Sequence, residues 1–154
     1  MKNLLLLMLL SLMVMGSNLE ITADSFYHKD GENKAVFSGN VIAKEGQNLI
    51  KANKITVLLD QNSEAKEYIA QGNVYFEIKS DKKFIKGTCN KIRYIPIKDT
   101  YYLNGNVVME DVINKRKVYG EEIILDNKHG SSYAKSGSKK PVKFIFKVKS
   151  KDAK

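Results

Sequence analysis

The chain has 154 residues, with 26 Lys and Arg against 17 Asp and Glu, and a formal net charge of +9. This length suits one domain with its own hydrophobic core. The basic excess favours acidic partners, but Arg93 and Arg116 are the only arginines and no cluster of aromatic and Arg residues occurs, which argues against nucleic-acid recognition. Cys89 is the only cysteine, so no intrachain disulfide can form and the fold depends on its core.

An apolar run extends from Leu4 to Met15, broken only by Ser11, and follows Lys2. As a helix it would be about 18 Å long, which is short of the ~30 Å hydrocarbon core of a bilayer. We therefore predict a signal peptide over residues 1–17, cleaved on export. The alternative is a retained short anchor. No cysteine stands at the expected cleavage position, directly after the run, which excludes a lipoprotein anchor. The predicted domain covers residues 18–149, and residues 150–154 are expected to be a disordered tail.

A Gly-Asn-Val tripeptide occurs three times, at Gly39, Gly72 and Gly105, and both intervals are 33 residues. Apolar residues around each copy alternate with polar ones, which is typical of strands with one covered face and excludes a helical solenoid. The predicted inward residues are Phe37, Val41, Ala43, Ala70, Val74, Phe76, Ile78, Tyr101, Leu103, Val107 and Met109.

A second repeated element begins at Ile21, Ile50, Ile85 and Val118. A spacing of three inside its period-two pattern requires an extra residue at a bulge or corner. We interpret its polar residues Asp24, Asn53 and Glu121 as bulge formers. In the copy at Ile85 we expect Gly87 at the small position, followed by two extra residues.

Turn-forming residues separate these elements and predict short loops between antiparallel strands. The expected loops are 29–34, 44–48, 60–66, 79–83, 110–117 and 126–141. A closing strand is expected over residues 141–149. The sequence thus predicts an all-β meander of bent strand pairs around a long apolar trough. The pattern leaves open whether side chains or a ligand fill this trough.

Residues 19–60 closely resemble the opening of LptA, of the OstA-like family of periplasmic lipopolysaccharide transport proteins, and the likeness continues to about Asp126. The resemblance implies an open, twisted β-jelly roll whose interior holds the acyl chains of lipid A. It also implies end-to-end stacking of copies between LptC-like and LptD-like proteins at the two membranes. It implies no catalytic residues and no cofactor. Family positions that line the interior correspond to Leu19, Ile21, Ile92 and Tyr94.

Two sets of site residues follow from the alternation and the resemblance together. The predicted lipid-binding residues are Leu19, Ile21, Phe37, Val41, Val74, Phe76, Ile92, Tyr94, Leu103, Val107, Met109, Ile123, Leu125, Phe144 and Phe146. The predicted headgroup-binding residues, expected to attract lipid phosphates, are Lys82, Lys83, Lys86, Lys115, Arg116 and Lys117. Ordinary core packing and a solvated rim are the alternatives for these two sets.

Other functions fit the sequence less well. The acidic pairs Glu110–Asp111 and Glu121–Glu122 are neighbours in strands, so their side chains point to opposite faces and cannot converge on a substrate. His28 and His129 lie far apart without ligand spacing, so we predict no metal site. An LptC-like membrane-anchored component and a self-associating structural envelope protein remain alternatives. The apolar edge strands near residues 19–23 and 142–148 favour end-to-end pairing.

Overall fold

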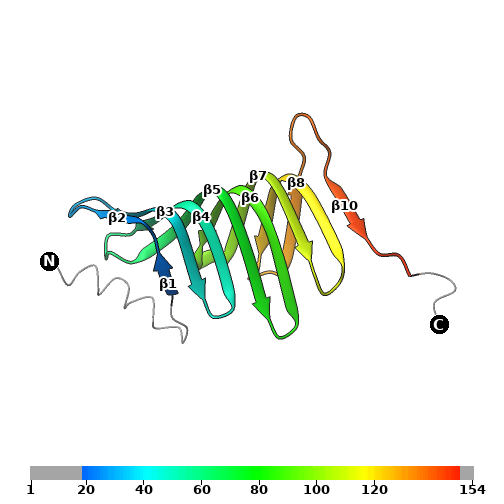
Figure 1. The fold of residues 1–154 in the computed structure, drawn as a ribbon, viewed down its shortest axis with the longest axis horizontal. Helices are drawn as coiled ribbons and strands as arrows, with labels where there is room; N and C mark the ends of the chain where they lie inside the picture. Colours follow the sequence, from blue (N-terminus) through cyan, green and yellow to red (C-terminus); the bar gives the residue numbers. More distant parts are fainter. Residues whose placement is uncertain (1–18, 150–154) are drawn as a thin grey trace.

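The computed structural model describes residues 19–149, which form one antiparallel sheet of ten strands (Figure 1). The strands are β1 (Leu19–Thr22), β2 (Ser25–His28), β3 (Lys34–Glu45), β4 (Asn48–Leu59), β5 (Ala65–Ser80), β6 (Lys83–Ile95), β7 (Thr100–Asp111), β8 (Arg116–Asp126), β9 (Ser131–Lys135) and β10 (Lys143–Phe146). A 3₁₀ turn, η2 (Pro96–Lys98), lies between β6 and β7. The all-β prediction is confirmed. The predicted signal peptide and the predicted tail lie outside the described residues.

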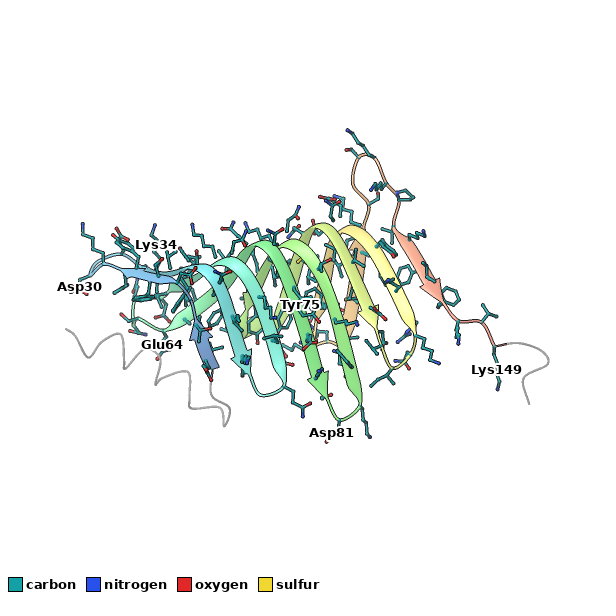
Figure 2. All side chains as sticks on the ribbon, viewed as in Figure 1. Asp30, Lys34, Glu64, Tyr75, Asp81 and Lys149 are labelled. Carbon is teal, nitrogen blue, oxygen red and sulfur yellow. The ribbon has the colours of Figure 1, made fainter. Side chains whose placement is uncertain are left out.

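The sheet is an open meander in the order β1-β3-β4-β5-β6-β7-β8-β10, with β2 beside β3 and β9 beside β8. The long strands bend near their middles and wrap around a common axis along the length of the molecule (Figure 1). Their turns therefore lie along two rims. Glu64 marks a turn on one rim and Asp81 a turn on the other (Figure 2).

The repeated glycines form the corners of these bent strands. Each has a positive φ, of +81° at Gly39, +80° at Gly72 and +82° at Gly105, and the register of the sheet shifts at each one. A Cβ atom at Gly72 would lie 2.6 Å from Nδ2 of Asn53. Asp24 and Asn90 lie in the same way against the other two glycines. The corner therefore requires glycine for its backbone conformation and for the close approach of a polar side chain.

The third copy of the second element differs from the prediction. Val41 is opposite Ala52, and Val107 is opposite Gly120, so a small residue faces the valine after each corner. In the third copy the residue opposite Val74 is Cys89 and not Gly87. The prediction was wrong because Gly87 resembled the small residue of the motif. The register shows that the two extra residues precede the small position, which Cys89 occupies. Cys89 thus occupies the position of a small core residue.

The end of the chain also differs from the prediction. Residues 126–141 were expected to be a loop, but β9 lies within them and pairs with the second half of β8. The closing strand is shorter than expected and covers only Lys143–Phe146, which pairs with the first half of β8. Together β9 and β10 form a fourth strand with a glycine corner, after β3, β5 and β7. Its corner glycine, Gly137, lies against the side chain of Glu121. The alternation was weak here because polar and small residues dominate.

The core lies between the two halves of the bent sheet. Its most buried large side chains are Val41, Val74, Phe76, Leu103, Val107 and Ile123. All residues predicted to face inward around the three Gly-Asn-Val copies belong to this cluster or pack against it. The alternation in the sequence therefore identified the covered face correctly.

Candidate functional site

An apolar cavity of about 610 Å³, here called the C-terminal chamber, opens between the two halves of the sheet near β8 and β9. Its apolar lining includes Ile78, Ile85, Met109, Val118, Ile123, Leu125, Ala134, Val142 and Phe144. If a methylene group occupies about the volume of a liquid water molecule, roughly 30 Å³, this space holds on the order of 20 methylenes. The chamber is therefore large enough for hydrocarbon chains.

A smaller cavity of about 100 Å³, the N-terminal chamber, lies at the opposite end of the molecule. Leu19 and Ile21 of β1 line it on one side, and Ile92 and Tyr94 of β6 on another. A space of about 30 Å³, here called the waist, lies between the chambers. The waist shares Ile50, Ile92 and Tyr101 with the N-terminal chamber, and it shares Ile78 and Leu125 with the C-terminal chamber. The two chambers and the waist therefore lie in series along the inner face, and together they are called the trough.

Stacked tyrosines form one wall of the N-terminal chamber. The ring centroids of Tyr94 and Tyr101 are 4.3 Å apart, and those of Tyr68 and Tyr94 are 6.3 Å apart. The hydroxyl group of Tyr94 donates a hydrogen bond to Asp99 Oδ1 at 3.2 Å. Burial raises the pKa of all three hydroxyl groups, and nearby Glu45 raises it further, so the rings stay neutral at ordinary pH. This wall is uncharged and aromatic.

A family model described as LptA/(LptD N-terminal domain) LPS transport protein matches residues 20–131. The chain belongs to this family. It is a lipopolysaccharide transport component, and the family is one of transport proteins rather than enzymes.

The fold supports this assignment. A crystal structure of LptH, the LptA homologous periplasmic component of the lipopolysaccharide transport device from Pseudomonas aeruginosa, superposes with a TM-score of 0.73. The alignment covers 84% of this chain and 95% of LptH at 22% sequence identity, so it demonstrates a common fold. Among curated protein sequences, none matches the chain.

The fifteen predicted lipid-binding residues differ in what they contact. Ten of them line a chamber or the waist, and an eleventh is a partly buried residue at the edge of the core. The residues that line a chamber or the waist are Leu19, Ile21, Phe76, Ile92, Tyr94, Leu103, Met109, Ile123, Leu125 and Phe144. The eleventh, Phe37, packs against the core and against the ring of Phe26, with centroids 4.9 Å apart.

The remaining four residues of this set lie elsewhere. Val41, Val74 and Val107 are each 1% exposed and fill the corners opposite small residues, so packing already explains them. Phe146, in contrast, is 59% exposed on β10 and lines neither chamber. A lipid-binding role stays a prediction for the whole set.

The predicted headgroup residues do not form one cluster. Lys83 and Arg116 line the C-terminal chamber. Their turns are neighbours, because the backbone N–H of Val112 donates to the carbonyl oxygen of Phe84 at 2.9 Å. Lys86 lies opposite acidic residues of β5 and β7, and Lys117 lies over the ring of Tyr119, with Nζ 5.9 Å from the centroid. Strand alternation places both of these lysines on the outer face.

Arg116 is held by a carboxylate at the mouth of the C-terminal chamber. Its Nη2 atom donates to Asp111 Oδ2 at 2.7 Å, and Asn114 Nδ2 donates to the same oxygen at 2.8 Å. Burial alone would raise the pKa of Asp111, but the hydrogen bonds from Asn114 and Arg116 lower it below its ordinary value. The carboxylate therefore stays ionised and fixes the guanidinium group beside the opening.

Other chemistry finds no support in residues 19–149. In this range no group of three or more His, Cys, Asp and Glu side chains is arranged to hold a metal ion. Burial raises the pKa of the Cys89 thiol to about 12, so it is a packed side chain and not a nucleophile. Across the same residues, no helix has the length and apolar character needed to cross a membrane.

Sequence reasoning missed several residues that line the trough, including Ile50, Tyr68 and Ala134. Ile50 had a signal, because it begins one copy of the second element and alternates with Ala52. Ala134 had none, since β9 lies in a stretch that reads as a loop. The part of the trough that β9 lines therefore became visible only in the structure.

Proposed function

We propose that the chain is a periplasmic carrier that holds the acyl chains of lipid A in the trough while lipopolysaccharide moves toward the outer membrane. The observation that carries this proposal is the C-terminal chamber, an apolar space of about 610 Å³ in a fold of this size. Each buried methylene contributes about 0.8 kcal/mol. A chain of ten methylenes inserted there would contribute about 8 kcal/mol before the costs of association.

The unequal chambers suggest how the lipid is distributed. The N-terminal chamber and the waist together hold only a few methylenes at roughly 30 Å³ each. We therefore assign the resting acyl chains to the C-terminal chamber. Passage along the trough would require the side chains at the waist, including Phe76 and Tyr101, to move apart.

The assignment to a lipid carrier can be tested by native mass spectrometry of protein exported to the periplasm and purified without detergent. We expect a bound species with the mass of a lipid A-containing molecule. Protein that carries no lipid, and that acquires none when mixed with purified lipopolysaccharide, would contradict the proposal. The mature N-terminus read from the same sample distinguishes a cleaved signal peptide near residue 17 from a retained LptC-like anchor.

Cations at the mouth of the C-terminal chamber should contribute part of the affinity. We expect that replacing Lys82 and Lys83 with Gln weakens lipopolysaccharide binding about three- to tenfold at low salt. Exposed charges are screened over roughly 8 Å at physiological ionic strength, so the difference from the parent should shrink as salt rises. Fluorescence titration at several salt concentrations measures this.

Lys86→Gln is the matched control, because Lys86 lies close to the same turn but on the outer face, between β5 and β7. It should change the affinity by less than twofold. An equal loss for the single variants Lys83→Gln and Lys86→Gln, which each remove one charge, would show that only net charge matters.

The ends of the sheet support pairing between copies, and between this chain and LptC-like or LptD-like proteins. Within residues 19–149, β1 and β10 are the end strands of the sheet, so each has one edge without a neighbouring strand. Phe144, Ile145 and Phe146 of β10 are all about half exposed. Such an apolar edge is a template for β-strand addition.

We expect concentration-dependent oligomers that disappear when residues 141–154 are deleted. The deletion removes β10 and its exposed Phe and Ile side chains and leaves β8 as the edge strand there, whereas the core between β3 and β8 remains. Deleting residues 150–154 alone is the control, because β10 stays intact, and its oligomers should persist. Sedimentation velocity at micromolar to millimolar concentrations measures both. Oligomers that survive the longer deletion would contradict pairing through β10.

A further inference from the structure

The fourth corner of the sheet is enlarged. In the first three corners the valine that packs inward follows the glycine by two residues, as at Gly72 and Val74. At the fourth corner the residue in this place is Val142, five residues after Gly137. Three extra residues therefore lie in the segment Gly137–Val142, and this loop projects beyond the line of corners between β9 and β10 (Figure 1).

A hollow of about 780 Å³ lies between this loop and the outer face of β7 and β8. Its lining includes Val108 and Tyr119 from the strands and Lys139, Lys140 and Lys143 from the enlarged corner and β10. Its volume lies in the range of roughly 300–1,000 Å³ that is usual for small-ligand sites. Val118 faces the trough and Tyr119 alternates with it, and the hollow shares no lining residue with the C-terminal chamber, although it reaches Val107 and Gly120 at the corner.

The hollow concentrates positive charge around one aromatic ring. Nζ of Lys143 lies 5.5 Å and Nζ of Lys117 lies 5.9 Å from the centroid of Tyr119. Neither lysine forms an ion pair with a carboxylate in the described part of the chain, and the same holds for Lys139 and Lys140. Ammonium groups gathered in this way repel one another, and a bound anion would relieve the repulsion.

Acidic groups compensate this charge only in part, with Glu110 opposite Lys117 in the register of β7 and β8. Residues 127–149 contain seven lysines and no Asp or Glu. Among the described residues, the only acidic one that lines the hollow is Glu121, whose Oε2 accepts a long hydrogen bond from the backbone N–H of Asn106 at 3.5 Å. An anionic ligand of small-molecule size therefore suits this hollow better than a neutral or cationic one.

We propose that the enlarged fourth corner is a binding site for an anionic saccharide that carries phosphate or carboxylate groups. The lysines would bind its anionic groups as point charges, and the ring of Tyr119 would pack against the C–H face of a sugar. The site is separate from the trough, so it requires no acyl chain. It would hold the sugar part of a glycolipid outside the sheet, or an unattached acidic glycan, by the same contacts.

The test uses the full mature chain and a fully deacylated, phosphorylated lipopolysaccharide saccharide, which has no acyl chains to occupy the trough. Calorimetry at low salt measures affinity, and amide chemical shifts locate the contact. We expect shifts at Tyr119 and residues 137–143. Lys139→Gln with Lys140→Gln should weaken binding about tenfold, and Tyr119→Leu should weaken it about fivefold. The control, Lys98→Gln with Lys128→Gln, removes the same charge from η2 and from the turn between β8 and β9, away from the corner, and should change binding less than twofold.

Three ligand arms distinguish the sources of binding. The dephosphorylated saccharide should bind at least tenfold more weakly, and an unrelated phosphorylated glycan should bind within about tenfold of the first. Inorganic phosphate that gives the same shifts with the same affinity would reduce the hollow to a nonspecific anion site and overturn the proposal. Shifts confined to residues 82–83 and 115–116, or an equal loss in the control variant, would also overturn it.

The result is independent of the lipid carrier proposal. Failure of saccharide binding with intact lipid binding rejects only this site, whereas intact saccharide binding without lipid binding rejects only the carrier. If Lys139→Gln with Lys140→Gln abolishes oligomers in sedimentation but leaves saccharide affinity unchanged, the loop is a contact between copies and the saccharide proposal is wrong.

Discussion

Replacing Met109 with Asp should lower the affinity for lipopolysaccharide at least tenfold and leave the protein folded. Met109 is only partly buried and lines the C-terminal chamber, opposite Gly87 and Val118 on the neighbouring strands. A bound acyl chain would remove the hydration water of a carboxylate at this position. If the carboxylate kept its water, that water would occupy space that the acyl chain needs. Either outcome costs more than about 1.4 kcal/mol, which corresponds to a factor of ten in affinity.

A second effect acts in the same direction. Arg116 and Lys83 line the same chamber, so a new carboxylate competes with the lipid phosphates for these cations. Met109 is also a better site for this test than Phe76, which is 2% exposed. A charge at Phe76 would unfold the protein, and the loss of binding would then be uninformative.

Thr88→Asp is the matched control. Thr88 is exposed on β6 and lies directly opposite Val108, on the outer face beside Met109. It receives the same charge at the same distance along the strands, but outside the trough. Titration of both variants with lipopolysaccharide, after circular dichroism has verified their folding, measures the difference. Equal affinities for Met109→Asp and the parent protein would exclude the C-terminal chamber as the lipid site.

Replacing Gly72 with Ala should destabilise the protein by about 2–4 kcal/mol, a large part of the roughly 5–15 kcal/mol that stabilises a typical domain. The positive φ of +80° costs an L-residue about 1–2 kcal/mol. The new methyl group would also lie 2.6 Å from Asn53 Nδ2 and 3.0 Å from Asn53 Cβ, so the Asn53 side chain must rotate and its Cβ must shift slightly. Urea unfolding should show a lower midpoint with an unchanged slope.

Gly46→Ala separates the two causes. Gly46 has a φ of +58° in the turn between β3 and β4, and no atom lies within 4 Å of a Cβ built there. It should therefore cost only the backbone penalty of about 1–2 kcal/mol. Combining Gly72→Ala with Asn53→Gly removes the obstructing side chain, so the double variant should be more stable than the sum of the single effects predicts. Equal costs at Gly46 and Gly72 would show that the contact with Asn53 is unimportant.

Much of the fold could be predicted because local rules control it. The alternation around Gly39, Gly72 and Gly105 identified the covered face, since side chains of a strand alternate and only one face is apolar. The same glycines marked the corners, because few other residues adopt a positive φ at low cost. The resemblance to the LptA family over the first three repeats was confirmed by the family model that matches residues 20–131.

The sequence by itself therefore determined the strand class, the inward face, the positions of the first three corners and the family. Only the tertiary structure decided which inward residues pack and which line open space. Val74 and Leu125 both lie on the inward face, yet Val74 is 1% exposed and Leu125 lines a chamber, because Val74 packs opposite Cys89 at a corner whereas Leu125 lies near the end of β8.

The tertiary structure also decided every feature that depends on pairing between distant residues. Register placed Cys89, and not Gly87, opposite Val74. Pairing with both halves of β8 revealed that residues 131–146 form a fourth strand with a glycine corner, which has three extra residues. Backbone hydrogen bonds with β8 stabilise this segment although its side chains alternate poorly, and a sequence pattern contains no information on those bonds.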